Sequence, residues 1–74
     1  MKDQETANLL ISKNIRKLRV DNKYTLQKMG EILGVTNQQF SLLELGKTRI
    51  FAAQLAILAK HFNINVEYFY KNNK

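Results

Sequence analysis

Few residues in this chain have the chemistry that an active site requires. His61 is the only histidine and the sequence has no cysteine, so it offers no thiolate nucleophile, disulfide framework or thiolate metal site. The acidic residues are scattered, no carboxylate pair lies near His61 in the sequence, and no glycine-rich phosphate loop occurs. We therefore expect a protein that is not an enzyme and that uses neither a metal ion nor a cofactor.

The side chains with the most specific hydrogen-bonding capacity gather in segment 36–45. Asn37 and Gln38 each carry an amide that can pair bidentately with adenine, which is worth about 1–3 kcal/mol of discrimination. A helix here would turn Phe40 and Leu43, three residues apart, toward the core. The opposite face then carries four residues: Gln38, Ser41, Leu42 and Leu45. Such a helix would present its N-terminal amides to base edges, and an apolar side chain on it can contact a thymine methyl group.

Local signals predict that this helix is the second of a pair joined by a tight turn over residues 25–46. Thr25 can cap the first helix, and Gly34 can supply the left-handed residue that ends it. Thr36 and Gln39 have the spacing of a capping box at the start of the second helix. The order of these signals favours a helix-turn-helix, which presents its second helix outward.

Gly30 lies inside the first of these two helices, where glycine is unusual. A glycine there costs about 1 kcal/mol relative to alanine, so a packing reason is expected. We predict that the second helix crosses closely beside Gly30 and leaves little room for a side chain. The alternative is an ordinary helical hairpin with a loosely packed glycine.

The remaining residues predict three further helices around this pair. Residues 1–5 are expected to fray, and a helix is expected to start near Thr6. A helix over 52–62 follows the basic loop, with Thr48 as the best available cap, and Asn65 can cap a last short helix over 65–70. The apolar stripe of the first helix would be Ala7, Ile11, Ile15 and Leu18. The sequence thus predicts an all-α fold, a compact bundle of about five short helices.

The length and hydropathy of the chain bound what this fold can be. Residues 1–74 are enough for one small domain, whose single core supplies roughly 3–5 kcal/mol, so help from a partner subunit would be unsurprising. No apolar run reaches the roughly 18 residues that a membrane span needs. The N-terminus carries acids before its short apolar patch, unlike a secretory signal. We expect a soluble cytoplasmic protein without a membrane partner.

The formal net charge of +6 favours a polyanionic partner. Most of the excess lies between Lys13 and Arg49, a stretch that carries eight lysines and arginines against three acidic residues. Phosphate contacts are expected from the residues that flank helix 36–45. These are Lys28 near the start of the preceding helix, and Lys47, Thr48 and Arg49 in the loop that follows. Arg16 and Lys17 are expected to be ordinary surface charges.

Several short motifs, in this order and spacing, resemble the phage-repressor and Cro family of helix-turn-helix domains, often called XRE-type. The resemblance runs from about Ile11 to Tyr70. Its motifs are Ile-Arg-Lys-Leu-Arg at 15–19, Met-Gly at 29–30, Leu-Gly-Val-Thr at 33–36, Gly-Lys at 46–47 and Phe-Asn-Ile at 62–64. The resemblance implies a lambda-repressor-like bundle that binds a palindromic operator in double-stranded DNA as a homodimer, with helix 36–45 in the major groove.

The resemblance also implies roles for single residues. Asn37, Gln38 and Leu42 occupy the principal base-reading positions of the family, and Ser41 shares their face. Arg19 and Glu44 are implied to form a structural ion pair between the first and third helices. The chain departs from the family pattern at Leu26, where glutamine is usual, and Gln27 is then the candidate to make the corresponding phosphate contact.

Two further hypotheses concern protein contacts. The last helix is too short to bury all of its apolar side chains against its own core, so we expect it to form the dimer contact. The residues concerned are Val66, Tyr68, Phe69 and Tyr70. The leading function is a sequence-specific transcription regulator, a repressor or autoregulator; the alternative is a protein-interaction module such as an antitoxin-like subunit. Leu45 fits either, and nonspecific nucleic-acid binding is disfavoured because no stacking aromatics lie among the cations.

Overall fold

The computed structural model describes residues 2–73 of the chain. It contains four α-helices: α1 (Lys2–Asp21), α2 (Leu26–Leu33), α3 (Asn37–Glu44) and α4 (Ala52–Phe62). A 3-10 helix, η1 (Val66–Tyr70), follows them. The all-α prediction is confirmed for the part of the chain that is described. The count of five short helices is wrong, because α1 is long and the last element is a single 3-10 segment.

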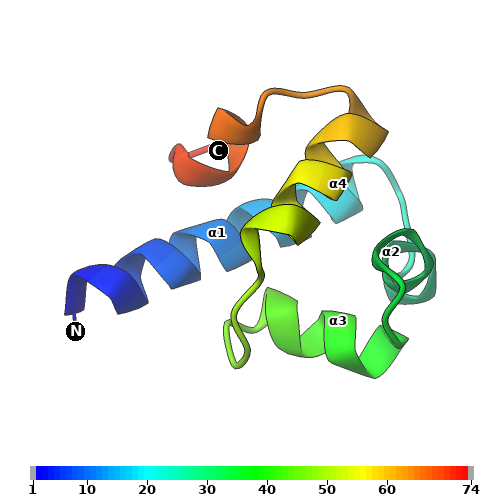
Figure 1. The fold of residues 1–74 in the computed structure, drawn as a ribbon, viewed down its shortest axis with the longest axis horizontal. Helices are drawn as coiled ribbons and strands as arrows, with labels where there is room; N and C mark the ends of the chain where they lie inside the picture. Colours follow the sequence, from blue (N-terminus) through cyan, green and yellow to red (C-terminus); the bar gives the residue numbers. More distant parts are fainter. Residues whose placement is uncertain (1, 74) are drawn as a thin grey trace.

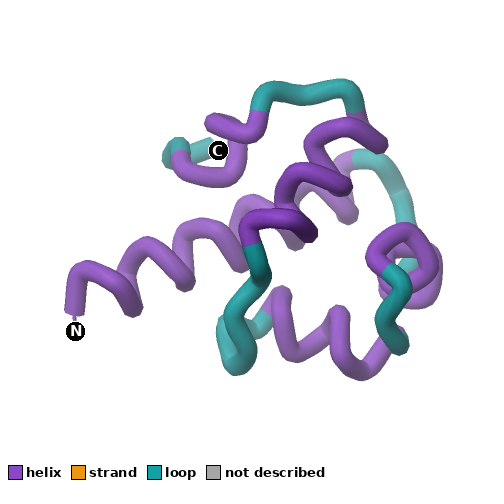
Figure 2. Tube along the Cα trace, in the orientation of Figure 1, coloured by secondary structure: helices purple, strands orange, loops and turns teal. Residues whose placement is uncertain are grey.

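The helices are arranged around α1, which is the longest element (Figure 1). The pair α2 and α3 lies at one side of the molecule, while α4 and η1 lie toward the other, and the first turns of α1 project beyond the bundle. Figure 2 shows the loop that connects α3 to α4, and this loop approaches α1 where Gly46 meets Leu9. The helix-turn-helix is therefore held between α1 and α4.

One apolar core joins all five elements. Phe40 and Phe69 are completely buried in it, together with side chains from α1, α2 and α4. The buried members are Ile15, Leu18, Met29, Phe40, Leu43, Leu55, Leu58, Ala59 and Phe69. The prediction that Phe69 forms part of a dimer surface is wrong, because its side chain is 0% exposed within its own subunit.

The start of α1 also differs from the prediction. The helix begins at Lys2 and not near Thr6, so the described part of segment 1–5 is helical, whereas Met1 lies outside the described residues. This segment contains no proline or glycine, so nothing in it interrupts the helix. Ala7 is exposed and does not belong to the apolar stripe, because the core does not extend that far along α1.

The other end of α1 and the start of α4 are both set by residues close to them in the chain. Lys23 adopts a left-handed conformation (φ 60°), so the chain turns after α1 without a glycine. Phe51, not Thr48, is the N-cap residue of α4. The side chain of Gln54 reaches back, and its Oε1 accepts a hydrogen bond of 2.8 Å from the backbone N–H of Phe51. No helix in the described part of the chain has both the length and the apolarity of a membrane span.

Candidate nucleic-acid interface

The turn between α2 and α3 is fixed by a cap at each end of α2. Thr25 Oγ1 accepts a hydrogen bond of 3.0 Å from the backbone N–H of Lys28 at the start of the helix. Gly34 ends the helix in the left-handed conformation (φ 74°), and the N–H of Val35 donates to the carbonyl oxygen of Gly30 at 2.8 Å. These bonds satisfy helix-end groups that would otherwise be unpaired. These bonds therefore fix the path of the chain from α2 into α3.

Gly30 allows this turn to lie directly against α2. A Cβ atom at Gly30 would meet the carbonyl oxygen of Val35 at 2.6 Å and the carbonyl carbon of Thr36 at 3.2 Å. The expected packing reason is thus present, although the crowding comes from the backbone that leads into α3 and not from side chains of a crossing helix. A residue with a side chain at position 30 would push the turn away from α2.

A capping box fixes the first turn of α3. Thr36 Oγ1 accepts from the N–H of Gln39 at 3.0 Å, and Gln39 Oε1 accepts from the N–H of Thr36 at 2.9 Å. Behind this turn, Phe40 and Leu43 are buried in the core. The carbonyl of the Gln39 amide is therefore already engaged within the protein, whereas the capping pattern leaves the amides of Asn37 and Gln38 unused.

The outer face of α3 carries the residues that were predicted to read bases. Asn37 and Gln38 are exposed, Leu42 is 39% exposed and Ser41 is half-buried. Leu45, the C-cap residue of α3, is 61% exposed. The fold thus brings two amides, a hydroxyl and an apolar side chain onto one outward face, and leaves a large apolar side chain beside them.

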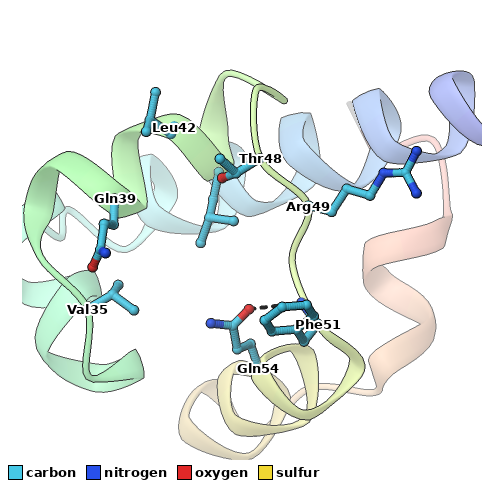
Figure 3. Close-up of a pocket in the computed structure, with 8 residues that line it drawn as sticks. Val35, Gln39, Leu42, Thr48, Arg49, Phe51 and Gln54 are labelled. Atoms are coloured by element: carbon cyan, nitrogen blue, oxygen red, sulfur yellow. Dashed lines mark hydrogen bonds between the residues drawn. The ribbon is translucent and has the colours of Figure 1, made fainter.

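The loop after α3 folds back onto the end of that helix. The N–H groups of Lys47 and Thr48 both donate to the carbonyl oxygen of Leu42, at 3.0 Å and 3.4 Å. Lys47, Thr48 and Arg49 are all exposed. Figure 3 shows Thr48 near Leu42 and the side chain of Arg49 pointing away from both; all three residues line a hollow that Phe51 lines from the side of α4. The basic loop and the outer face of α3 therefore form one continuous surface.

The start of α2 carries the other two residues that are predicted to contact phosphate. Gln27 and Lys28 are both exposed in its first turn. Leu26, which stands where the family usually has glutamine, is partly buried and packs against the core. Its side chain contributes to folding, and Gln27 is the exposed amide nearest to that position.

An ion pair links α1 to the end of α3. Arg19 Nε donates to Glu44 Oε2 at 2.6 Å and Arg19 Nη2 donates to Glu44 Oε1 at 3.2 Å, which is a bidentate arrangement. Arg19 Nη1 also donates to the carbonyl oxygen of Tyr24 at 3.1 Å. The two side chains are only 18% and 7% exposed. The carboxylate of Glu44 is thereby neutralised close to the outer face of α3.

Sequence reasoning missed the contact that attaches η1 to α1. Asn14 is almost completely buried, and its Nδ2 donates to the carbonyl oxygens of Phe69 at 2.9 Å and Lys71 at 2.6 Å. The available signal was a polar residue between Ile11 and Ile15, inside the predicted apolar stripe. Such a residue needs a buried partner, which here is supplied by backbone 55 residues away.

The remaining polar features lie away from α3. Burial raises the pKa of the Tyr68 phenol, and a hydrogen bond from Lys17 to Asp21 raises the pKa of Lys17. His61 is exposed, and its Nε2 lies 3.3 Å from the hydroxyl of Tyr24. No group of three His, Asp or Glu side chains within the described residues is placed to hold a metal ion.

Comparison with known proteins agrees with this geometry. A family model described as helix-turn-helix matches residues 15–69. A protein of Rickettsia conorii strain Malish 7, named as an uncharacterized HTH-type transcriptional regulator, is 31% identical over 61 residues. This match covers 82% of the present chain and 49% of the relative, so the chain spans about half of that protein's length. No solved structure matches.

Proposed function

Because this chain belongs to the XRE-type helix-turn-helix family, we propose that it binds specific sites in double-stranded DNA and regulates transcription. The observation that carries this proposal is the outer face of α3, which presents free amides at its N-terminal end and adjoins the basic loop at its C-terminal end. A helix of this kind enters the major groove and reads base edges. As a repressor or autoregulator, the protein would act by occupying its operator.

In this proposal the residues of α3 have separate reading roles. Asn37 and Gln38 would pair with base edges, most favourably with adenine, through their amides. Leu42 would contact a thymine methyl group, and the hydroxyl of Ser41 would reach the same groove from the half-buried edge of the helix. The side-chain oxygen of Gln39 is not available for this role, because it accepts the capping bond from the N–H of Thr36.

Phosphate contacts would position α3 without reading sequence. The candidates on the loop after α3 are Lys47, Thr48 and Arg49, and those on α2 are Gln27 and Lys28. Glu44, which would repel phosphate, is held by Arg19. The net charge of +6 supports long-range attraction to DNA.

We further propose that the protein binds a palindromic operator as a homodimer through η1. Val66 and Tyr70 are 40% and 53% exposed at its surface, and tyrosine is suited to an interface because it is apolar with a polar tip. Sedimentation at micromolar concentration should show a dimer that Tyr70→Glu dissociates and the control Tyr70→Phe preserves. A wild-type monomer that also lacks tight binding to a palindromic site would contradict this arrangement.

The test of DNA reading begins with selection of bound sequences from random duplex DNA. Gln38→Ala should then weaken binding to the selected site by about 1–3 kcal/mol and relax preference at one base position. Lys47→Ala should weaken binding about equally on all sequences and lower the salt slope by about 1. The exposed Lys60 of α4 offers a matched control, since Lys60→Ala removes the same charge away from α3.

A specific observation also favours the rival function. Leu45 and Phe51 are 61% and 71% exposed near α3, and Phe51 lines an open apolar hollow there, as a protein-binding surface would. If Gln38→Ala leaves the ranking of sites unchanged and Lys47→Ala leaves binding unchanged while both variants fold, DNA reading is refuted. The domain would then be assigned to protein interaction, for example as an antitoxin-like subunit.

A further inference from the structure

The outer face of α3 is bordered by a hollow on each of its two sides. On the side of α4, the hollow of Figure 3 is lined by Leu42 and by Arg49 of the basic loop. On the side of α1, a second hollow is lined by Ser41 and Leu45 together with two cations of α1, Lys13 and Arg16. Cations therefore stand on both flanks of the helix that is proposed to read DNA.

Lys13 and Arg16 differ from the next cation of α1 in their freedom to bind a ligand. They lie three residues apart, on one face of the helix, and both are exposed. Neither takes part in an ion pair with any residue of segment 2–73 whose side chain is described. Lys17, by contrast, is bonded to Asp21 at 2.9 Å on the same helix. The expectation that Arg16 is an ordinary surface charge thus overlooks its position beside α3.

The charge of the second hollow is positive because its single carboxylate is already neutralised. Glu44 lines the hollow, but it is held bidentately by Arg19, which lines it too. The uncompensated charges of this hollow are those of Lys13 and Arg16. A phosphate group is the complementary occupant, since arginine binds it through a planar fork and lysine as a point charge.

We propose that Lys13 and Arg16 contact the phosphates of one DNA strand, while Arg49, which lines the hollow on the side of α4, contacts the other strand of the same major groove. The inference rests on the proposed function. The groove is about 12 Å wide and an α-helix with its side chains has about that diameter, so a helix in the groove has one strand on each flank. Two cationic flanks match two strands, and α1 becomes part of the DNA-binding surface.

The experiment compares Lys13→Gln, Arg16→Gln and the double variant with Lys17→Gln as the matched control. Affinity for the selected site is measured as a function of salt. Each lost phosphate contact lowers the slope of log affinity against log salt concentration by about 0.9. The loss of affinity between 50 and 200 mM salt therefore becomes about 3.5-fold smaller for each contact removed. The double variant should lose about twice that slope, and the ranking of single-base variants of the site should stay the same. Lys17→Gln should leave the slope near that of the wild type.

Duplexes that carry a single neutral methylphosphonate linkage show which DNA strand each set of cations contacts. The wild type should lose affinity at one cluster of linkages on each strand. The Lys13→Gln/Arg16→Gln variant should become insensitive to one of the two clusters, and Arg49→Gln should become insensitive to the other. Unchanged urea midpoints would show that all of these exposed variants fold.

Two results would overturn this inference without affecting the proposed function. One is a double variant with the same salt slope as Lys17→Gln, and the other is loss of sensitivity on the strand that Arg49→Gln also affects. In both cases Gln38→Ala would still relax base preference, so the proposed function would stand. If the wild type itself selects no sequence and shows no salt dependence, the proposed function fails and this inference fails with it.

Discussion

Arg19→Ala is expected to destabilise the fold severely, because it leaves Glu44 buried without its partner. The Glu44 side chain is 7% exposed and accepts two hydrogen bonds from the guanidinium, at 2.6 Å and 3.2 Å. Removing one partner of a buried ion pair costs about 3–5 kcal/mol. A single core of this size supplies roughly the same free energy, so the variant should be largely unfolded at 25 °C.

Glu44→Ala should cost less, because the remaining cation has alternatives. Arg19 is 18% exposed, so it can reach water, and it keeps its hydrogen bond to the carbonyl oxygen of Tyr24. We expect a loss of about 1–3 kcal/mol. The double variant should lose less than the sum of the two single variants, by about 1–3 kcal/mol, because the two residues are in direct contact.

The wild type, the two single variants and the double variant form a double-mutant cycle. The free energy of unfolding of all four is measured by urea titration followed by circular dichroism. Trimethylamine oxide at one concentration in every sample would keep the weakest variant folded at zero urea. The exposed pair Lys17 and Asp21 on the same helix serves as a control cycle, which should show a much smaller coupling. Losses for Arg19→Ala and Glu44→Ala that add to within about 0.5 kcal/mol would refute the reasoning, since the contact would then contribute no coupling.

Three further predictions concern stability. Gly30→Ala should cost about 1–2 kcal/mol, since the crowding of a Cβ against Val35 exceeds the gain in helix propensity of about 1 kcal/mol; a urea midpoint no lower than that of the exposed control Glu31→Ala would contradict it. Asn14→Ala should cost about 1–3 kcal/mol by leaving the carbonyl group of Phe69 without a donor, whereas Lys71 keeps its bonds from Asn73; a loss under about 0.5 kcal/mol would show that water replaces the amide. Burial raises the folded-state pKa of Tyr68 above its unfolded value of 10.0, so its contribution is complete below pH 10 and is lost as the pH rises further. Tyr68→Phe should therefore lessen the alkaline loss of stability, and an unchanged decline in a pH series of urea titrations would count against this cause.

The helix-turn-helix and α4 were predictable because their limits depend on residues close together in the chain. Thr25 and Thr36 each accept a hydrogen bond from a backbone N–H three residues away, so each cap can be recognised within a four-residue segment. Gly34 and Asn63 mark helix ends through the left-handed conformation that their residue types tolerate. The predicted bounds of 52–62 for α4 are confirmed for the same reason.

The features that escaped prediction depend on contacts between distant segments. The carbonyl oxygen of Phe69 is bonded to Asn14, 55 residues earlier, and this attachment brings the Phe69 ring into the core. In a segment as short as η1, the periodicity of the sequence does not show which aromatic side chain is buried in the core. The extent of α1 was missed because helix continuity depends on the absence of breakers, while the predicted start relied on an apolar stripe that Ala7 does not join.

The candidate site was predictable at the level of residue types and of the face that carries them. In the proposed complex, the base that each residue would meet depends on how α3 is tilted in the groove, which the DNA and a second subunit would help to set. The cations of α1 illustrate a different limit. Lys13 and Arg16 gain significance only because the fold places them beside Ser41 of α3, and nothing in their local sequence distinguishes them from Lys17.

The capping box of α3 also determines how a randomised library of this domain should be built. Gln39 lies next to the residues that are proposed to read bases, yet its side-chain oxygen accepts a hydrogen bond from the N–H of Thr36. Glutamate can make the same backward bond, whereas other residues at this position would release the first turn of the helix. Clones selected against new target sequences should therefore vary freely at positions 37, 38, 41 and 42, while position 39 returns as glutamine or glutamate.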